Sequence, residues 1–215
     1  MKNEYLNEMF IPGTGYPKVQ FTAVQAKDID MIAGWMENEK IHQWLDMGGG
    51  RQLISKMQLH SMLMSQRTCA RLFGVPGGLP IGLICIHDID NLMGSADMWG
   101  LRGVYAKGPS NVATAAALVG LATGYLDYGR EVMRTWVVDG NHRSLLIHRK
   151  LGLREVGKAR SCHVMNGKRY DRYLFDMTRD EFANLYPEVP SESGKTFRAL
   201  SRAFSTTYYP MAVSA

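Results

Sequence analysis

The chain has few cysteines, no long hydrophobic run and no low-complexity segment. Its three cysteines, Cys69, Cys85 and Cys162, lie far apart without the spacing of metal ligands, so we expect no metal site. Reduced thiols of this kind are typical of the cytoplasm. No apolar stretch approaches the ~20 residues of a membrane-spanning helix, and residues 1–15 lack the charged-then-apolar pattern of a secretion signal. The sequence therefore predicts a cytoplasmic protein with no membrane partner.

The charge of the chain does not indicate a nucleic-acid partner. The formal net charge is +5 and the isoelectric point is near 9.1, but the basic residues are scattered among acids and do not alternate with aromatic residues. We therefore expect no nucleic acid partner. A ligand that carries several phosphate groups also fits a basic surface.

The length and composition suit one globular domain with extensions. The chain has 215 residues, and 46% of them are hydrophobic. We expect an N-terminal extension at 1–16, one domain at 17–186, and a linker and tail at 187–215. An apolar stripe from Phe197 to Phe204 in the tail suits a docked helix, a partner contact or a mobile tail. Whether the protein forms a homodimer is left open.

Strand-like and helix-like segments alternate along the chain. Period-two or apolar runs predict strands at 19–24, 68–75, 79–88, 96–106, 132–138, 154–165 and 168–177. Helical spacing and capping signals predict helices at 27–36, 40–46, 53–65, 112–128, after Asn141, and up to about 186. This order predicts a mixed α/β fold class, with a central mixed sheet of about seven strands and helices on both faces. The helix at 53–65 is predicted to carry an apolar stripe of Leu53, Met57, His60 and Met64.

The stretch from Val104 to Leu153 organises the chain. Residues 104–114 run from an apolar strand through a Gly-Pro turn into a helix. Backbone N–H groups at the start of a helix have no intrahelical partner, and together with the helix dipole they form a ready site for phosphate. The strand at 132–138 then leads into Asn141 and a second helix.

Residues 141–153 carry the pattern Asn, Ser three residues later, an apolar pair, an aromatic ring, Lys, and Leu-Gly-Leu. This pattern resembles the second signature of the GCN5-related N-acetyltransferases. The helix start before it lies where that family has its pyrophosphate loop. Asn111-Val112-Ala113 stands there for Gly-x-Ala, and Gly108 stands where Gln or Arg is usual. The similarity runs from about Val19 to Met177.

By this resemblance, the protein is an N-acetyltransferase that moves an acetyl group from acetyl-CoA to a primary amine by direct attack in a ternary complex. The acceptor is a small-molecule amine or a protein N-terminus. The backbone of the strand before the loop and two side chains after the next strand would bind the pantetheine arm, and the helix start would bind the pyrophosphate. The implied cofactor-binding residues are Val104, Tyr105, Asn111, Val112, Ala113, Thr114, Asn141 and Ser144.

The resemblance also implies two catalytic residues. His148 stands where the family commonly has a tyrosine that protonates the departing CoA thiolate. A neutral imidazole donates one N–H, and an imidazolium acts as a general acid if a nearby carboxylate raises its pKa; a solvent-facing His148 is the alternative. Asp97 stands where the family often has an acid, and either Asp97 or Asp88 relays the amine proton through water. Surface roles for these carboxylates are equally open.

The acceptor is not identified by the sequence. Trp35 and Trp44 line the acceptor pocket or anchor the core. The Trp35–Asn38 segment resembles the branch that acetylates ribosomal-protein N-termini, aminoglycosides and nucleotide-linked amino sugars. Two alternatives remain: an acyltransferase that uses a longer acyl thioester, and a catalytically silent CoA-binding or interaction module.

Overall fold

The computed structural model describes residues 11, 13–103 and 108–189. Within them, seven strands form one sheet in the order β1-β2-β3-β4-β5-β7-β6. The strands are β1 (Gln20–Ala23), β2 (Thr68–Gly74), β3 (Gly82–His87), β4 (Ser95–Arg102), β5 (Val132–Val138), β6 (Arg154–Met165) and β7 (Lys168–Thr178). All neighbours pair antiparallel except β4 and β5, which are parallel. The predicted mixed α/β fold is confirmed. The predicted contacts of Val104 and Tyr105, and the stripe in the tail, lie outside the described residues.

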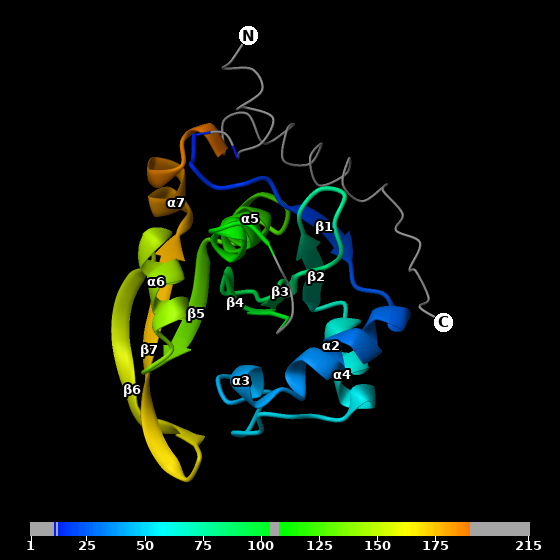
Figure 1. Ribbon diagram of the computed structural model, residues 1–215. Coiled ribbons are helices and arrows are strands. Elements are labelled where there is room, and N and C mark those ends of the chain that lie inside the picture. The colour runs from blue at the N-terminus through cyan, green and yellow to red at the C-terminus, as the bar shows by residue number, and fades with distance from the viewer. Residues whose placement is uncertain (1–10, 12, 104–107, 190–215) are drawn as a thin grey trace.

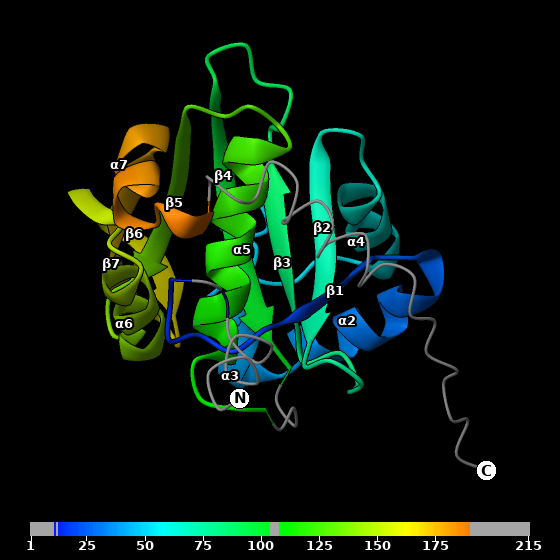
Figure 2. The same ribbon diagram turned by 90° about the horizontal axis from the view of Figure 1, so that it is seen from above.

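Helices cover both faces of this sheet (Figures 1 and 2). A single 3₁₀ turn (Ala26–Asp28) precedes α2 (Ile29–Met36), and α3 (Glu39–His42) and α4 (Lys56–Leu63) follow on the same face. The opposite face carries α5 (Val112–Leu126), α6 (His142–Lys150) and α7 (Arg179–Leu185). Each face has its own hydrophobic cluster. None of the helices in the described residues is long and apolar enough to cross a bilayer.

The sheet opens between β4 and β5. The two strands pair only from Ser95 and Val132 to Asp97 and Arg134, although β4 continues to Arg102 and β5 to Val138. On its other side, β4 stays in regular register with β3 from Asp97 to Arg102. The opening therefore does not arise from a bulge in this stretch of β4.

The helix α5 lies along the middle of the sheet (Figure 2). Twelve of its fifteen residues are buried, so the helix is surrounded by protein over most of its length. Small residues permit this close approach: a Cβ at Gly120 would lie 2.8 Å from the sulfur of Met98, and one at Gly124 would overlap Met133. This packing fixes the first turn of α5 beside the sheet.

The predicted apolar stripe on the helix at 53–65 is wrong. Leu59 and Leu63 are the residues of α4 that are buried, whereas Met57 is 79% exposed. The helix begins later than predicted because Ser55 is its N-cap, with a capping box to Gln58. Leu59 and Leu63 are four residues apart and so share one face of α4, and this face packs on the core while Met57 lies outside.

The packing of the domain continues past both predicted limits. Ile11 and Val189 are buried in the cluster under α5, α6 and α7. Two local features near the end of the domain have sequence signals of their own. Asn166 and Gly167 both have positive φ, as a type I′ hairpin turn requires, and Thr178 forms a capping box with Glu181 at the start of α7.

Candidate active site

The first turn of α5 combines free N–H groups with a cation. Asn111 precedes the helix with φ +62°, and its carbonyl accepts the N–H of Ala115 at 2.8 Å. Its side chain does not cap the helix, and its Oδ1 instead accepts a hydrogen bond from Lys150 Nζ at 3.0 Å. The end of α6 thereby brings an ammonium group to the start of α5. Helix N-terminus and ammonium together form an anion-binding arrangement.

The loop before α5 passes close to the sheet. A Cβ at Gly108 would lie 2.8 Å from Ile81 Cδ1 and 3.5 Å from Val112 Cγ1. A larger residue at this place would require the Ile81 side chain to move. On the other side, the hydroxyl of Tyr16 donates to the Lys150 carbonyl at 3.2 Å and fixes the end of α6.

The start of α6 is built by Asn141. Its Oδ1 accepts the N–H of Ser144 at 3.3 Å, so Asn141 is the N-cap of α6. The carbonyl of Ser144 in turn accepts a hydrogen bond from His148 Nδ1 at 2.7 Å. These contacts place both residues between the end of β5 and the His148 ring.

The ring of His148 is held at both nitrogens. Because a carbonyl only accepts, Nδ1 carries a proton and donates to Ser144, and Nε2 lies 3.1 Å from Thr135 Oγ1. A neutral ring therefore accepts the Thr135 hydroxyl proton at Nε2 and has no N–H to donate there. Burial lowers the pKa of His148, and the bond to Ser144 only partly offsets this. The one N–H of the neutral ring is donated to Ser144, so the neutral-donor alternative does not fit the hydrogen bonding. No carboxylate is among these contacts to raise the pKa of the ring.

Asp97 lies on β4 at the point where the sheet opens. Its two carboxylate oxygens accept hydrogen bonds from Arg134 Nε at 3.0 Å and Nη2 at 2.8 Å. Both side chains are 47% exposed. His87 on β3 is directly opposite Asp97, so an imidazole, a carboxylate and a guanidinium form one row across three strands.

Two tryptophans flank the opening, and sequence reasoning did not identify them. Trp99 and Trp136 each follow the last paired residue of their strand by two positions, so both lie on the face of Asp97 and Arg134. Trp99 Nε1 donates to His87 Nε2 at 2.5 Å. The signal in the sequence is a spacing of two residues, from Asp97 to Trp99 and from Arg134 to Trp136. This spacing can be interpreted only when the register of β4 and β5 is known.

Trp35 packs against the sheet. Its indole nitrogen would lie 2.7 Å from a Cβ at Gly103, and it borders the cluster formed by α2, α4, β2 and β3. This position favours the core-anchor alternative for Trp35. Across the described ranges, His, Cys, Asp and Glu form no group of three that could hold a metal ion.

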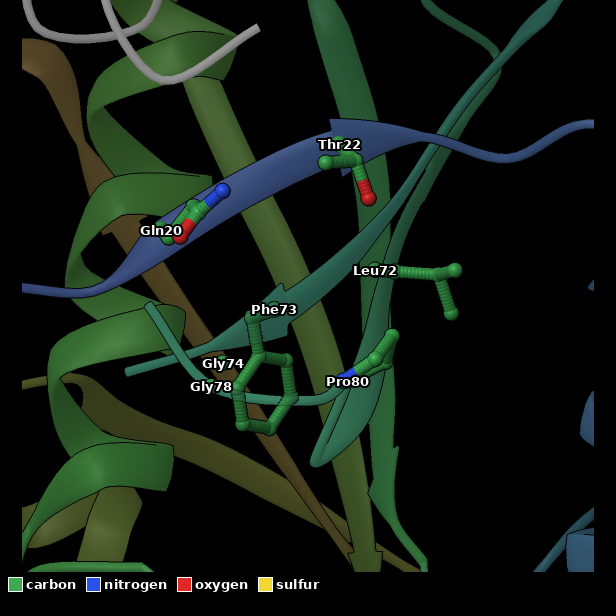
Figure 3. Close-up of a pocket in the computed structure, with 7 residues that line it drawn as sticks. All are labelled: Gln20, Thr22, Leu72, Phe73, Gly74, Gly78 and Pro80. Atoms are coloured by element: carbon green, nitrogen blue, oxygen red, sulfur yellow. The ribbon is translucent and has the colours of Figure 1, made fainter. Parts of the chain in front are cut away.

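An open depression lies at the β1–β2 edge of the sheet (Figure 3). It is lined by Gln20, Thr22, Leu72, Phe73, Gly74, Gly78 and Pro80. None of the predicted site residues lines it. It is separated from the opening by β3, so it is not part of the candidate active site.

No protein-family model matches the chain, and no curated protein matches it. Solved structures do match. The spermidine N-acetyltransferase from Vibrio cholerae, solved in complex with CoA and spermine, superimposes with a TM-score of 0.68 at 15% identity, over 77% of this chain and 98% of that one. RimJ from Mycobacterium smegmatis, solved with CoA-disulfide, gives a TM-score of 0.64 at 18% identity, over 80% and 88% of the two chains.

The chain has the GCN5-related N-acetyltransferase fold. A dodecameric structure of the V. cholerae enzyme also superimposes, with a TM-score of 0.64 at 13% identity, over 77% of this chain and 96% of that one. At these identities the likeness establishes the fold, and the roles of individual residues have to be argued from this chain's own contacts.

Proposed function

We propose that this protein is an acetyl-CoA-dependent N-acyltransferase that acetylates a primary amine by direct attack in a ternary complex. One observation carries the proposal. The strands β4 and β5 separate after Asp97 and Arg134, and the first turn of α5, with its N–H groups, lies beside Lys150. An extended thioester arm fits an opening between two strands. Its pyrophosphate fits a helix N-terminus.

The residues that would hold the donor follow from these contacts. The N–H groups of Ala113 and Thr114, in the first turn of α5, would bind pyrophosphate oxygens, and Lys150 would add a charge-assisted hydrogen bond. Asn141 and Ser144 would bind the pantetheine arm through groups that capping does not use. Acetyl-CoA supplies the activated acetyl group and the thiolate leaving group.

Two proton transfers accompany the reaction. The attacking amine loses a proton, which we assign to Asp97 through a water molecule, because this half-exposed carboxylate lies at the edge of the opening. The departing thiolate gains a proton, which we assign to His148. Because burial lowers the pKa of His148, the protonated fraction of the ring is the acid. Since Nε2 faces Thr135, this imidazolium would pass its proton to the Thr135 oxygen while the Thr135 hydroxyl gives its own proton to sulfur.

For the acceptor we propose a chemical class, the primary amines, and no single compound. Polyamines, peptide N-termini and aminoglycosides all present a primary amine, and the solved relatives include a spermidine N-acetyltransferase. We propose that the protein acts in the cytoplasm. A longer acyl chain and a silent CoA-binding module are the alternatives to be separated by experiment.

The test of the donor site is calorimetric titration with acetyl-CoA. Micromolar binding is expected, and Lys150→Met weakens it by about tenfold because it removes a hydrogen bond from a charged group. Lys168→Met, at an exposed position of the β6–β7 hairpin, is the matched control and leaves the affinity unchanged. Absence of binding by the unmodified protein contradicts the proposed function, and equal effects of both variants contradict the role of Lys150.

A further inference from the structure

A buried polar cluster ties the segment after α3 to the β6–β7 hairpin. Asp46 Oδ2 accepts from Arg172 Nη2 at 2.7 Å, and these side chains are only 17% and 13% exposed. The same Nη2 lies 2.9 Å from His163 Nδ1, and His163 Nε2 lies 2.6 Å from the carbonyl of Gln43. We call Asp46, Arg172 and His163 the clasp.

The hydrogen bonding of the clasp requires one protonation state. The Gln43 carbonyl only accepts, so His163 Nε2 carries a proton, and Nδ1 must then accept from Arg172. Both nitrogens have a defined role only when the ring is neutral. The Arg172 guanidinium also lies over the Trp136 ring, 4.0 Å from its centre. Arg172 therefore holds three groups from three different parts of the chain.

The other oxygen of Asp46 shapes a glycine turn. Oδ1 accepts the N–H groups of Gly48 at 2.9 Å and Gly50 at 3.0 Å. Gly48, Gly49 and Gly50 have φ of +105°, +63° and +80°, which only glycine adopts readily. Asp46 thus determines the path of this turn on one side and binds Arg172 on the other.

A second contact fixes the far end of the same segment. Gln52 Nε2 donates to the Gln43 carbonyl at 3.1 Å and to the Val164 carbonyl at 2.9 Å. Residues 43–52 are therefore bound to the hairpin at both ends. We refer to residues 43–52 as the acceptor-side segment.

The clasp lies on the face of the sheet opposite α5. Trp136 is the residue of β5 that follows Arg134 on that face, and Arg172 on β7 pairs with Val138 at the end of β5. In Figure 1 the tip of the β6–β7 hairpin extends to the level of α3, on the side away from α5. Under the proposed function, a thioester that enters from the α5 side would present its carbonyl to this face, and the amine would approach past the acceptor-side segment.

We propose that Arg172 is a positioning residue for the acceptor amine: it holds the acceptor-side segment and Trp136 beside the opening, and so sets the affinity for the amine without contacting CoA. This inference rests on the proposed function. A buried ion pair contributes little to stability when compared with well-packed apolar residues. A role in fixing the path of the Gly48–Gly50 turn and the Trp136 ring explains why the charges are buried at this place.

The test is steady-state kinetics with whichever of spermine, a short peptide with a free N-terminus, or an aminoglycoside is acetylated fastest. Arg172→Met is expected to raise the KM for the amine by about tenfold, since it removes a hydrogen bond between charged groups. The KM for acetyl-CoA stays unchanged, and Arg172→Lys recovers part of the loss. Arg169→Met is the matched control, because Arg169 lies on the same strand and, within the described residues, its side chain donates to the Ser161 carbonyl of the hairpin.

A second variant keeps the test decisive if Arg172→Met does not fold. Asp46→Asn retains the acceptor oxygen for Gly48 and Gly50 but weakens the bond to Arg172, so it raises the amine KM in the same direction. Hydrogen exchange is the readout that does not depend on turnover. Exchange at residues 46–52 becomes faster in both variants, while exchange in α5 does not change.

A pH profile separates positioning from a merely structural role. Protonation of His163 places an N–H against Arg172, with Asp46 the other charged group that faces the ring. Protonation of the amine itself raises its apparent KM in both proteins as the pH falls, so the readout is the ratio of the two KM values. The amine KM of Arg172→Met divided by that of the unmodified protein decreases below about pH 6.5, because protonation of His163 weakens the clasp in the unmodified protein alone. An unchanged amine KM in Arg172→Met overturns the inference alone. Absence of any acetylation by the unmodified protein overturns the proposed function and this inference with it.

Discussion

Asp97 and Arg134 are the last residues through which β4 and β5 pair, and their side chains form a two-point ion pair at the place where the strands separate. The pair is half exposed, so its contribution to stability is small. In the proposed function, its position at the edge of the opening gives the carboxylate access to the attacking amine. A structural role and the proposed catalytic role of Asp97 make different predictions for the two members of the pair.

The first prediction compares the two sides of this ion pair. Asp97→Asn lowers kcat by about 10²-fold, the effect of one proton-transfer group, because the amide accepts no proton. Arg134→Met keeps the carboxylate and lowers kcat far less. The measurement is kcat across the pH range for both variants. Equal losses would mean that the pair only holds the strands together.

The second prediction concerns the first turn of α5. Ala113→Glu places a carboxylate where the pyrophosphate is expected, and repulsion between like charges abolishes CoA binding. The side chain of Ala113 is partly exposed, so the circular dichroism spectrum stays the same. Met57→Glu, in the first turn of α4, is the matched control and binds CoA normally. Normal binding by Ala113→Glu would show that the phosphate site lies elsewhere.

The third prediction concerns the relay from His148. His148→Ala lowers kcat by about 10²-fold with little change in CoA affinity, and Thr135→Val causes a similar loss because the proposed relay from Nε2 passes through the Thr135 hydroxyl. His148→Tyr recovers part of the activity. Burial lowers the pKa of His148, so the acid form is lost, and kcat falls, as the pH rises through a value below about 6.5.

Where chemistry limits turnover, His148→Ala lacks that pH dependence. An alanine variant with unchanged kcat would exclude His148 from the mechanism and leave thiolate protonation to water. Loss of activity in His148→Ala but not in Thr135→Val would favour direct donation by a rotated ring.

The fourth prediction is the pH dependence of stability that arises from His163. Burial lowers the pKa of His163, and the neighbouring Arg172 lowers it further, although the bond to the Gln43 carbonyl raises it. The unfolded chain therefore binds the proton more readily than the folded protein, and stability rises with pH. The contribution is complete above about pH 6.5 and is lost as the pH falls toward the lowered pKa.

Thermal unfolding between pH 5 and 7.5 measures this effect. His163→Gln, whose amide has a donor but no titratable group, is expected to show a shallower fall in Tm toward low pH. His142→Gln, at an exposed position in the first turn of α6, leaves the profile unchanged. Identical profiles for His163→Gln and the unmodified protein would show that another group titrates.

The fifth prediction tests the domain limits. We propose that the tail is dispensable, so a chain that ends at residue 190 stays folded and binds CoA. A chain that ends at residue 186 loses Val189, which is buried in the core, and melts at a lower temperature. Loss of a cooperative unfolding transition in the chain that ends at residue 190 would show that the tail belongs to the core or to a dimer interface.

Most of the strands were predictable because their signals are local. The limits of β5 and β6 agree with the predicted ones. An apolar run bounded by turn residues sets the limits of β5, and the Asn166–Gly167 turn sets the end of β6. The start of α5 and the N-cap at Asn141 are local in the same way. The fold class followed from the order of these elements.

The site contacts were not predictable because they join distant residues. Arg172 and Asp46 are 126 positions apart, and Thr135 meets His148 only because β5 and α6 pack together. The wrong prediction for α4 has the same cause, since it too depends on contacts between distant residues. Both faces of that helix carry apolar residues, and Leu59 and Leu63 are buried because their face packs against the sheet.

The most direct test of the account is mass-spectrometric detection of both products after incubation with acetyl-CoA and a primary amine. Mass detection is preferable to a thiol-reactive dye, because Cys162 is exposed and would react with it. The account predicts free CoA and acetylated amine in equal amounts for at least one of spermine, a free peptide N-terminus and an aminoglycoside. Binding of acetyl-CoA without acetylation of any of these amines would contradict it and favour a catalytically silent CoA-binding module.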